Sequence, residues 1–136
     1  KPSTLTIEIT EGLAMKNVEH YTTMLEDLRR LGVNISMDDF GTGYSSLSYL
    51  KRFPLTTLKI DRSFIKDLHI DEDDKEITKA IIAMGQSLNL TTLAEGVENE
   101  EQLEILRDYG CDYIQGFYYS KPMPAAEMTE YLRSLE

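Results

Sequence analysis

The feature that most constrains the fold is a strand followed by a helix, repeated five times along the chain. The first strand is predicted at Leu5–Thr10, where apolar residues alternate with polar ones. The other strands are predicted at Val33–Asp38, Leu58–Asp61, Leu90–Glu95 and Tyr113–Gln115. Helical spacing of apolar residues predicts helices at Val18–Leu31, about Ser45–Lys51, Asp74–Leu88, Glu100–Tyr109 and Pro124–Leu135. Such an α/β pattern requires parallel strands joined by right-handed crossovers.

Two architectures fit this pattern: an open doubly wound sheet, or part of a closed (β/α)₈ barrel. In a barrel the outward face of each strand packs on helices, whereas the inward face can be polar near the carboxyl ends. The first three strands fit the barrel, because apolar pairs would face out and leave Glu8, Asp38 and Lys59 facing in. The last two strands fit less well, because an apolar or aromatic residue would lie on the same face as the polar strand-end residue. Leu93 would share a face with Glu95, and Tyr113 with Gln115.

Composition narrows the possible functions. The 136 residues contain no internal repeat or linker, so we expect one domain spanning residues 1–136. Acidic residues outnumber basic ones by 24 to 14, which argues against binding a nucleic-acid polymer. No apolar run is long enough to span a bilayer, so we expect no membrane contact by this segment. The single cysteine, Cys111, favours a reducing, cytoplasmic location, although a parent protein could be membrane-anchored.

Each predicted strand ends with a charged or amide side chain. These strand-end residues are Glu8, Asp38 and Asp39, Lys59, Glu95 and Gln115. One acidic residue at a strand end is commonly a turn former or a helix cap, but five such ends in a row indicate a site at the carboxyl edge of the sheet. Carboxylates without a neighbouring His or Cys suit Mg²⁺ or Mn²⁺ better than Zn²⁺. Carboxylates with one lysine are typical of two-metal phosphodiester hydrolysis.

Five sequence blocks, in order, resemble the signature motifs of the EAL family of cyclic di-GMP phosphodiesterases. The blocks are Ile7–Glu11, Asp38–Leu47, Leu58–Asp61, Ala94–Glu98 and Gln115–Gly116. The resemblance implies five consecutive βα units of a partial TIM-type barrel and hydrolysis of cyclic di-GMP to the linear dinucleotide pGpG. It also implies a two-metal site that uses Mg²⁺ or Mn²⁺ and is inhibited by Ca²⁺.

The resemblance also implies roles for individual residues. Glu8 and Asp38 would bind one metal ion, and Asp38, Asp39 and Glu95 would hold the second. Lys59 would contact the attacking water, and Gln115 would support water or metal. Glu11 would brace the loop that contains Gly41 and Gly43, a loop that couples metal binding to dimerisation in the family. Substrate contacts would come from Asp39, Lys59 and Glu98. Alternatively, Glu98 would contact other residues of the site and not the substrate itself. A purely electrostatic role for Lys59, neutralising the carboxylates, stays open.

The chain lacks other parts of the family pattern. The Glu-Ala-Leu motif, its following arginine and an asparagine strand do not occur in it. We therefore expect the C-terminal part of one EAL domain, weak or inactive alone, that forms a homodimer or a domain-swapped assembly. The parent protein is expected to carry sensory or GGDEF domains. A cyclic di-GMP receptor without catalysis, and a dimerisation module, remain the alternative functions.

Several residues are expected to have no catalytic role. Asp71–Asp74 resembles a calcium loop only superficially, and we expect its charges to favour a helix N-terminus. His20 and His69 are expected to be ordinary surface residues. The methionine and tyrosine side chains on helices are expected to lie in the core, as is Ile77 on the apolar face of its helix.

Overall fold

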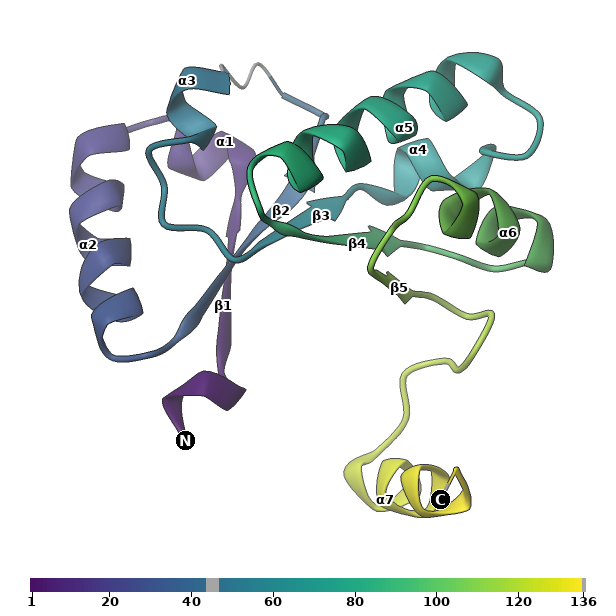
Figure 1. Ribbon diagram of the computed structural model, residues 1–136. Helices are drawn as coiled ribbons and strands as arrows, with labels where there is room; N and C mark the ends of the chain where they lie inside the picture. The colour runs from purple at the N-terminus through teal and green to yellow at the C-terminus, as the bar shows by residue number, and fades with distance from the viewer. Residues whose placement is uncertain (44–46, 136) are drawn as a thin grey trace.

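The computed structural model describes residues 1–43 and 47–135, and it forms a parallel sheet with alternating helices (Figure 1). The strands are β1 (Thr6–Thr10), β2 (Asn34–Phe40), β3 (Thr57–Ile60), β4 (Thr91–Glu95) and β5 (Tyr113–Gln115). The helices are α1 (Glu11–Ala14), α2 (Val18–Arg30), α3 (Leu47–Leu50), α4 (Arg62–Lys66), α5 (Glu72–Ser87), α6 (Glu100–Asp108) and α7 (Ala125–Ser134), preceded by the 3-10 helix η1 (Pro2–Thr4).

Strand order decides between the two architectures that the sequence left open. Within the described residues the five strands lie in the order β1-β2-β3-β4-β5, and every neighbouring pair is parallel. In a doubly wound sheet the order in which successive strands are added reverses at a switch point, whereas in a barrel each new strand is added on the same side. The sheet therefore has the strand order of a barrel, as the first three strands predicted.

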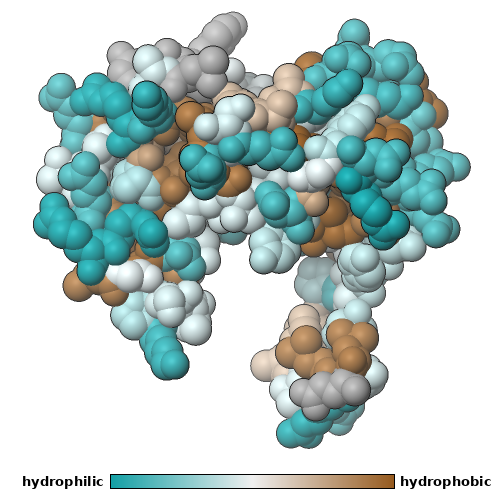
Figure 2. All heavy atoms as spheres, viewed as in Figure 1, coloured by the Kyte–Doolittle hydropathy of each residue, from teal (hydrophilic) through white to brown (hydrophobic). Residues whose placement is uncertain are grey.

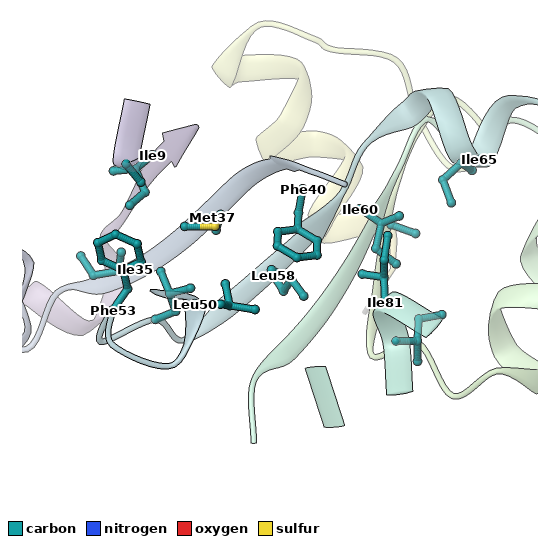
Figure 3. Close-up of a cluster of buried hydrophobic side chains, with 14 of the residues drawn as sticks. Ile9, Ile35, Met37, Phe40, Leu50, Phe53, Leu58, Ile60, Ile65 and Ile81 are labelled. Carbon is teal, nitrogen blue, oxygen red and sulfur yellow. The ribbon is translucent and has the colours of Figure 1, made fainter. Parts of the chain in front are cut away.

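The two faces of the sheet differ sharply in burial. Side chains on the helix-covered face are almost completely buried, among them Ile35, Met37, Leu58 and Ile60. Figure 3 shows these side chains with Ile9, Phe40, Leu50, Phe53, Ile65 and Ile81 in one cluster. In β4 the buried residues on this face are Thr92 and Ala94, which leaves Leu93 and Glu95 on the inward face. Small outward residues thus explain why the parity of β4 was ambiguous from sequence.

Side-chain caps mark the starts of α5 and α6. Asp71 caps α5 by accepting hydrogen bonds from the backbone N–H groups of Asp73 and Asp74, so α5 begins at Glu72 rather than Asp74. This confirms that the acidic run favours a helix N-terminus. Asn99 and Gln102 form the expected capping box at the start of α6. The short helices α1 and α4 were not predicted, because four or five residues show no apolar period. The first residues of the helix predicted from Ser45 lie outside the described part of the chain.

Several side chains expected in the core are exposed. Met24, Ile77 and Met128 are each 37–40% exposed, so the core expectation is wrong for them. Met128 lies on α7, which stands apart from the sheet in Figure 1 and has hydrophobic residues open to solvent in Figure 2. The surface expectation holds for His20, whereas His69 has its Nδ1 atom buried without a hydrogen-bond partner among the described residues. No helix in the described part of the chain is both long and apolar enough to cross a membrane.

Candidate active site

The centre of the site is the ammonium group of Lys59. Its Nζ atom lies 2.6 Å from Glu95 Oε1, 2.9 Å from Glu8 Oε1 and 3.0 Å from Asp38 Oδ1. The side chain of Lys59 is only 5% exposed, while those of Asp38 and Glu95 are 23% and 20% exposed and that of Glu8 is half exposed. A buried cation therefore joins carboxylates from three other strands.

Strand register explains why these side chains meet. Glu8, Lys59 and Glu95 belong to the inward-facing rows of β1, β3 and β4, and Asp38 lies near the end of β2. Neighbouring parallel strands keep these rows in step, with Ile9 beside Met37 and Lys59 beside Leu93. The carboxyl ends of parallel strands lie at one edge of the sheet, as the sequence argument required. The structure thus brings Glu8, Asp38, Lys59 and Glu95 together.

Electrostatics keep Lys59 protonated. Burial alone would lower the pKa of the Lys59 ammonium, because removal from water disfavours the charged form. Hydrogen bonds to Glu95, Glu8 and Asp38 outweigh burial and raise the pKa above the ordinary lysine value. At neutral pH this side chain is consequently a hydrogen-bond donor with no lone pair for a metal ion.

Asp39 has an unusual backbone conformation. Its φ is +55°, in the left-handed region that few residues other than glycine adopt, and the β2–β3 pairing shifts register between Met37 and Phe40. The carboxyl groups of Asp38 and Asp39 interact electrostatically, although an ideal strand would place these consecutive side chains on opposite faces. Backbone strain of this kind commonly accompanies functional sites.

The Asp39 carboxyl is also electrostatically crowded. Partial burial raises its pKa, and so do the negative charges of Asp38 and Asp61 and a hydrogen bond with Asp61, while Lys59 opposes the shift. The Asp39 carboxyl group is therefore crowded by the negative charges of Asp38 and Asp61 at the ends of β2 and β3. A cation placed among them would relieve that repulsion. Asp61, which also caps α4, is a site residue that sequence reasoning did not single out.

Glu11 contacts the turn after β2. Its side chain is almost completely buried, and its Oε2 atom accepts a hydrogen bond from the backbone N–H of Gly41 at 3.0 Å. Gly43 packs so closely that a Cβ atom there would lie 2.7 Å from Glu11 Oε1. A side chain at position 43 would therefore have to displace the Glu11 carboxylate. Tyr44–Ser46, the middle of the same sequence block, lies outside the described residues.

A pocket of about 360 Å³ adjoins the carboxylates. Strand β5 pairs Gln115 with Glu95, and both residues line this pocket. Its other lining residues are Arg62, Gly96, Glu98, Gly116, Phe117, Ser120, Lys121, Pro122 and Met128. Arg62 Nη2 donates a hydrogen bond to Glu98 Oε1 at 2.7 Å. Glu98 was predicted from sequence to lie at the site, whereas Arg62 was not, because its position beside Glu98 depends on tertiary structure.

The donor chemistry of the site fits a hard divalent cation. The candidate ligands Glu8, Asp38, Asp39 and Glu95 offer only carboxylate oxygens, which Mg²⁺, Mn²⁺ and Ca²⁺ accept. In residues 1–43 and 47–135, however, no group of three or more His, Cys, Asp or Glu side chains is arranged around a shared metal position. Three of the candidate ligands, Glu8, Asp38 and Glu95, instead form ion pairs with the ammonium of Lys59.

Comparison with known proteins identifies the family. The model of the EAL domain matches residues 1–122. The chain belongs to the EAL family. It is 52% identical over 130 residues to the cyclic di-GMP phosphodiesterase NbdA of Pseudomonas aeruginosa. The aligned residues make up 96% of this chain but 17% of NbdA. The chain thus spans less than a fifth of that relative.

Solved EAL structures agree with the fold. The P. aeruginosa MucR phosphodiesterase, solved as a complex with cyclic di-GMP, superposes with a TM-score of 0.91 at 53% identity over 93% of this chain and 51% of that chain. Klebsiella pneumoniae BlrP1, solved with cyclic di-GMP and either manganese or calcium, gives a TM-score of 0.83 at 34% identity over 90% of this chain and 31% of that chain. These similarities confirm the predicted EAL fold.

Proposed function

We propose that this chain supplies the catalytic edge of a cyclic di-GMP phosphodiesterase, active in a complete EAL domain that contains it. The observation that carries the proposal is the convergence of Glu8, Asp38 and Glu95 on Lys59 within 3.0 Å. Support also comes from NbdA, a named cyclic di-GMP phosphodiesterase, and from the MucR complex with cyclic di-GMP. The product would be linear pGpG.

The carboxylates would hold two divalent metal ions. Glu8 and Asp38 would contribute to one ion, and Asp38, Asp39 and Glu95 to the other, with Asp61 close enough to Asp39 to join them. Bound metal would supply an activated water and neutralise the phosphate charge. Lys59, released from some of its carboxylate partners, would donate a hydrogen bond to the nucleophilic water, and Gln115 would orient water or metal from β5. Support comes from the crowding of Asp38, Asp39 and Asp61.

The adjoining pocket would bind one half of the dinucleotide. It is polar on the side of Glu95, Glu98 and Gln115, and it carries Phe117 and Met128 as apolar surface for a base. Lys121 lies 5.6 Å from the Phe117 ring centroid, which puts a positive charge beside the pocket for a phosphate. Asp39, Lys59 and Glu98 would be the substrate contacts of this proposal.

Metal-dependent turnover tests the proposed activity. In a complete EAL domain that includes this chain, Mg²⁺ or Mn²⁺ should support hydrolysis of cyclic di-GMP, measured by chromatography of pGpG. Ca²⁺ should support binding without turnover, because its longer and less directional bonds misplace the water. Equal rates with Ca²⁺ would contradict the proposed geometry. Nucleotide binding without hydrolysis in any of the three metals would favour the receptor alternative.

The 136 residues alone should be weak or inactive and should not persist as a monomer. The inward face is open in the described structure: Tyr113 is 63% exposed and Glu8 is half exposed. Strands β1 and β5 have free edges that favour pairing with other chains. A groove lined by Phe40, Leu50 and the α5 residues Ile77, Ala80, Ile81 and Met84 supports a homodimer, with a domain swap as the other route. Light scattering that shows a stable monomer would overturn this expectation.

The setting of the domain is part of the proposal. The relative MucR of P. aeruginosa is named as a bifunctional diguanylate cyclase and cyclic di-GMP phosphodiesterase, which supports fusion to a GGDEF or sensory domain. A cytoplasmic location is supported by the lone thiol of Cys111.

A further inference from the structure

We infer that Arg62 is a positioning residue that fixes Glu98 in the pocket and thereby makes the site selective for guanine. The inference rests on the proposed function, because it concerns how that site reads its nucleotide. Arg62 is the first residue of α4, and Asp61 fixes the start of this helix by accepting a hydrogen bond from the backbone N–H of Ser63 at 2.8 Å. The backbone of Arg62 is consequently held next to the carboxylate cluster.

The side chain of Arg62 lies flat against the loop between β4 and α6. Gly96 in this loop has a left-handed φ of +76°, and a Cβ atom there would collide with the Cγ atom of Arg62. Glycine therefore allows the aliphatic part of the arginine to contact the loop backbone directly. This packing directs the guanidinium along the loop to Glu98, where Nη2 and Oε1 are 2.7 Å apart.

Glu98 is held a second time through its backbone. The buried side chain of Gln102 accepts hydrogen bonds from the backbone N–H groups of Glu98 at 2.7 Å and Asn99 at 3.2 Å. The same amide donates to the carbonyl oxygens of Ile65 and Lys66 at the other end of α4, at 3.0 Å each. Helix α4 thus fixes the side chain of Glu98 through its first residue and the backbone of Glu98 through its last turn.

One oxygen of the Glu98 carboxylate is available to a ligand in the pocket. Glu98 lines the pocket, and its Oε2 atom accepts no hydrogen bond from the described residues, whereas Oε1 is held by Arg62. Guanine presents two adjacent donors, N1–H and the exocyclic N2–H, which match the two oxygens of a fixed carboxylate. Adenine presents an unprotonated N1 at the same place, and that lone pair would face the negative charge. A site built to pair with donors rejects an analogue that lacks them.

Binding measurements on two Arg62 variants and one control variant test the role of Arg62. Arg62→Gln keeps much of the stem against Gly96 but removes the charge, and Arg62→Lys keeps a charge without the planar fork. Arg30→Gln is the matched control, because Arg30 forms a similarly exposed ion pair with Asp27 on α2. Each variant is made in a complete EAL domain that includes this chain. Calorimetry in Ca²⁺ then gives the Kd for cyclic di-GMP and for cyclic di-AMP.

Arg62→Gln should weaken cyclic di-GMP binding about fivefold, the effect of losing an exposed ion pair, and leave cyclic di-AMP binding unchanged. Arg62→Lys should recover part of the loss, and Arg30→Gln should change nothing. With Mg²⁺ the KM should rise by the same factor while kcat and metal affinity stay constant. Equal weakening of both nucleotides, or unchanged preference for guanine, would overturn the inference alone. A parent domain that binds no cyclic di-GMP would overturn the proposed function, and the inference with it.

Discussion

Replacing Lys59 with methionine should separate the two roles that the lysine can have. Methionine keeps the length and the apolar stem of the side chain but removes the ammonium that contacts Glu8, Asp38 and Glu95. Lys75→Met is the matched control, since it makes the same change in net charge at an ion pair with the exposed Glu72 on α5. Both variants belong in a complete EAL domain that includes this chain.

The expected loss of stability follows from burial. Removing one partner of a buried ion pair costs about 3–5 kcal/mol. The half-exposed Glu8 can turn to water, and Asp38 and Glu95 are also reached by solvent, so we expect about 3 kcal/mol for the metal-free domain. A domain of some 250 residues loses about 2–4 °C per kcal/mol, so the Tm should fall by about 10 °C. Saturating Mg²⁺ should recover much of this loss, because it neutralises the same carboxylates.

A loss of activity of similar size in free energy is also expected. A preorganised hydrogen-bond donor to the reacting groups is worth about 100-fold or more in kcat, and methionine cannot replace it. On both variants, single-turnover kinetics give the rate of hydrolysis, calorimetric titration gives the Mg²⁺ affinity, and thermal melts give the Tm. If Lys59 only neutralised the carboxylates, Lys59→Met would keep a near-normal kcat at saturating Mg²⁺. That result would refute the catalytic role assigned to Lys59.

Three further predictions concern the surrounding structure. Glu11→Ala should speed hydrogen exchange of the Gly41 amide at least about tenfold and lower kcat, because that amide loses its buried acceptor; unchanged exchange would contradict the brace. Asp112→Ala should destabilise the fold by about 2 kcal/mol in denaturant titration, since Asp112 Oδ2 accepts hydrogen bonds from the N–H and hydroxyl of buried Thr92 at 2.7 and 2.9 Å; an unchanged midpoint would refute this. Burial raises the Cys111 pKa, so iodoacetamide should react slowly at pH 8 and faster as rising pH forms the thiolate; rapid alkylation at pH 8 would count against it.

Much of the fold follows from local sequence pattern. Alternation predicted β1 and β3 within about a residue, and caps such as Asn99 predicted the start of α6. The parity of β4 could not be predicted, because its outward residues Thr92 and Ala94 are small rather than strongly apolar. Burial of helix residues was predicted less well, since it depends on what packs against each helix: α7 has no buried residue in the described structure.

The candidate site was predictable to the extent that it lies at strand ends. Glu8, Asp38, Lys59 and Glu95 are brought together by parallel register, which the sequence pattern implies. The left-handed conformation of Asp39 and the contact between Arg62 and Glu98 depend on backbone irregularity and on the placing of α4 beside the β4–α6 loop. No periodicity in the sequence indicates these features.

The most direct test of the central claim is the fate of a water oxygen during hydrolysis. A complete EAL domain that includes this chain, given cyclic di-GMP and Mg²⁺ or Mn²⁺ in ¹⁸O-labelled water, should form pGpG with one ¹⁸O atom in its new terminal phosphate, seen by mass spectrometry. The label should enter there because an activated water attacks phosphorus and the 3′ oxygen leaves. Intact cyclic di-GMP after prolonged incubation, or a product without ¹⁸O in that phosphate, would contradict the account.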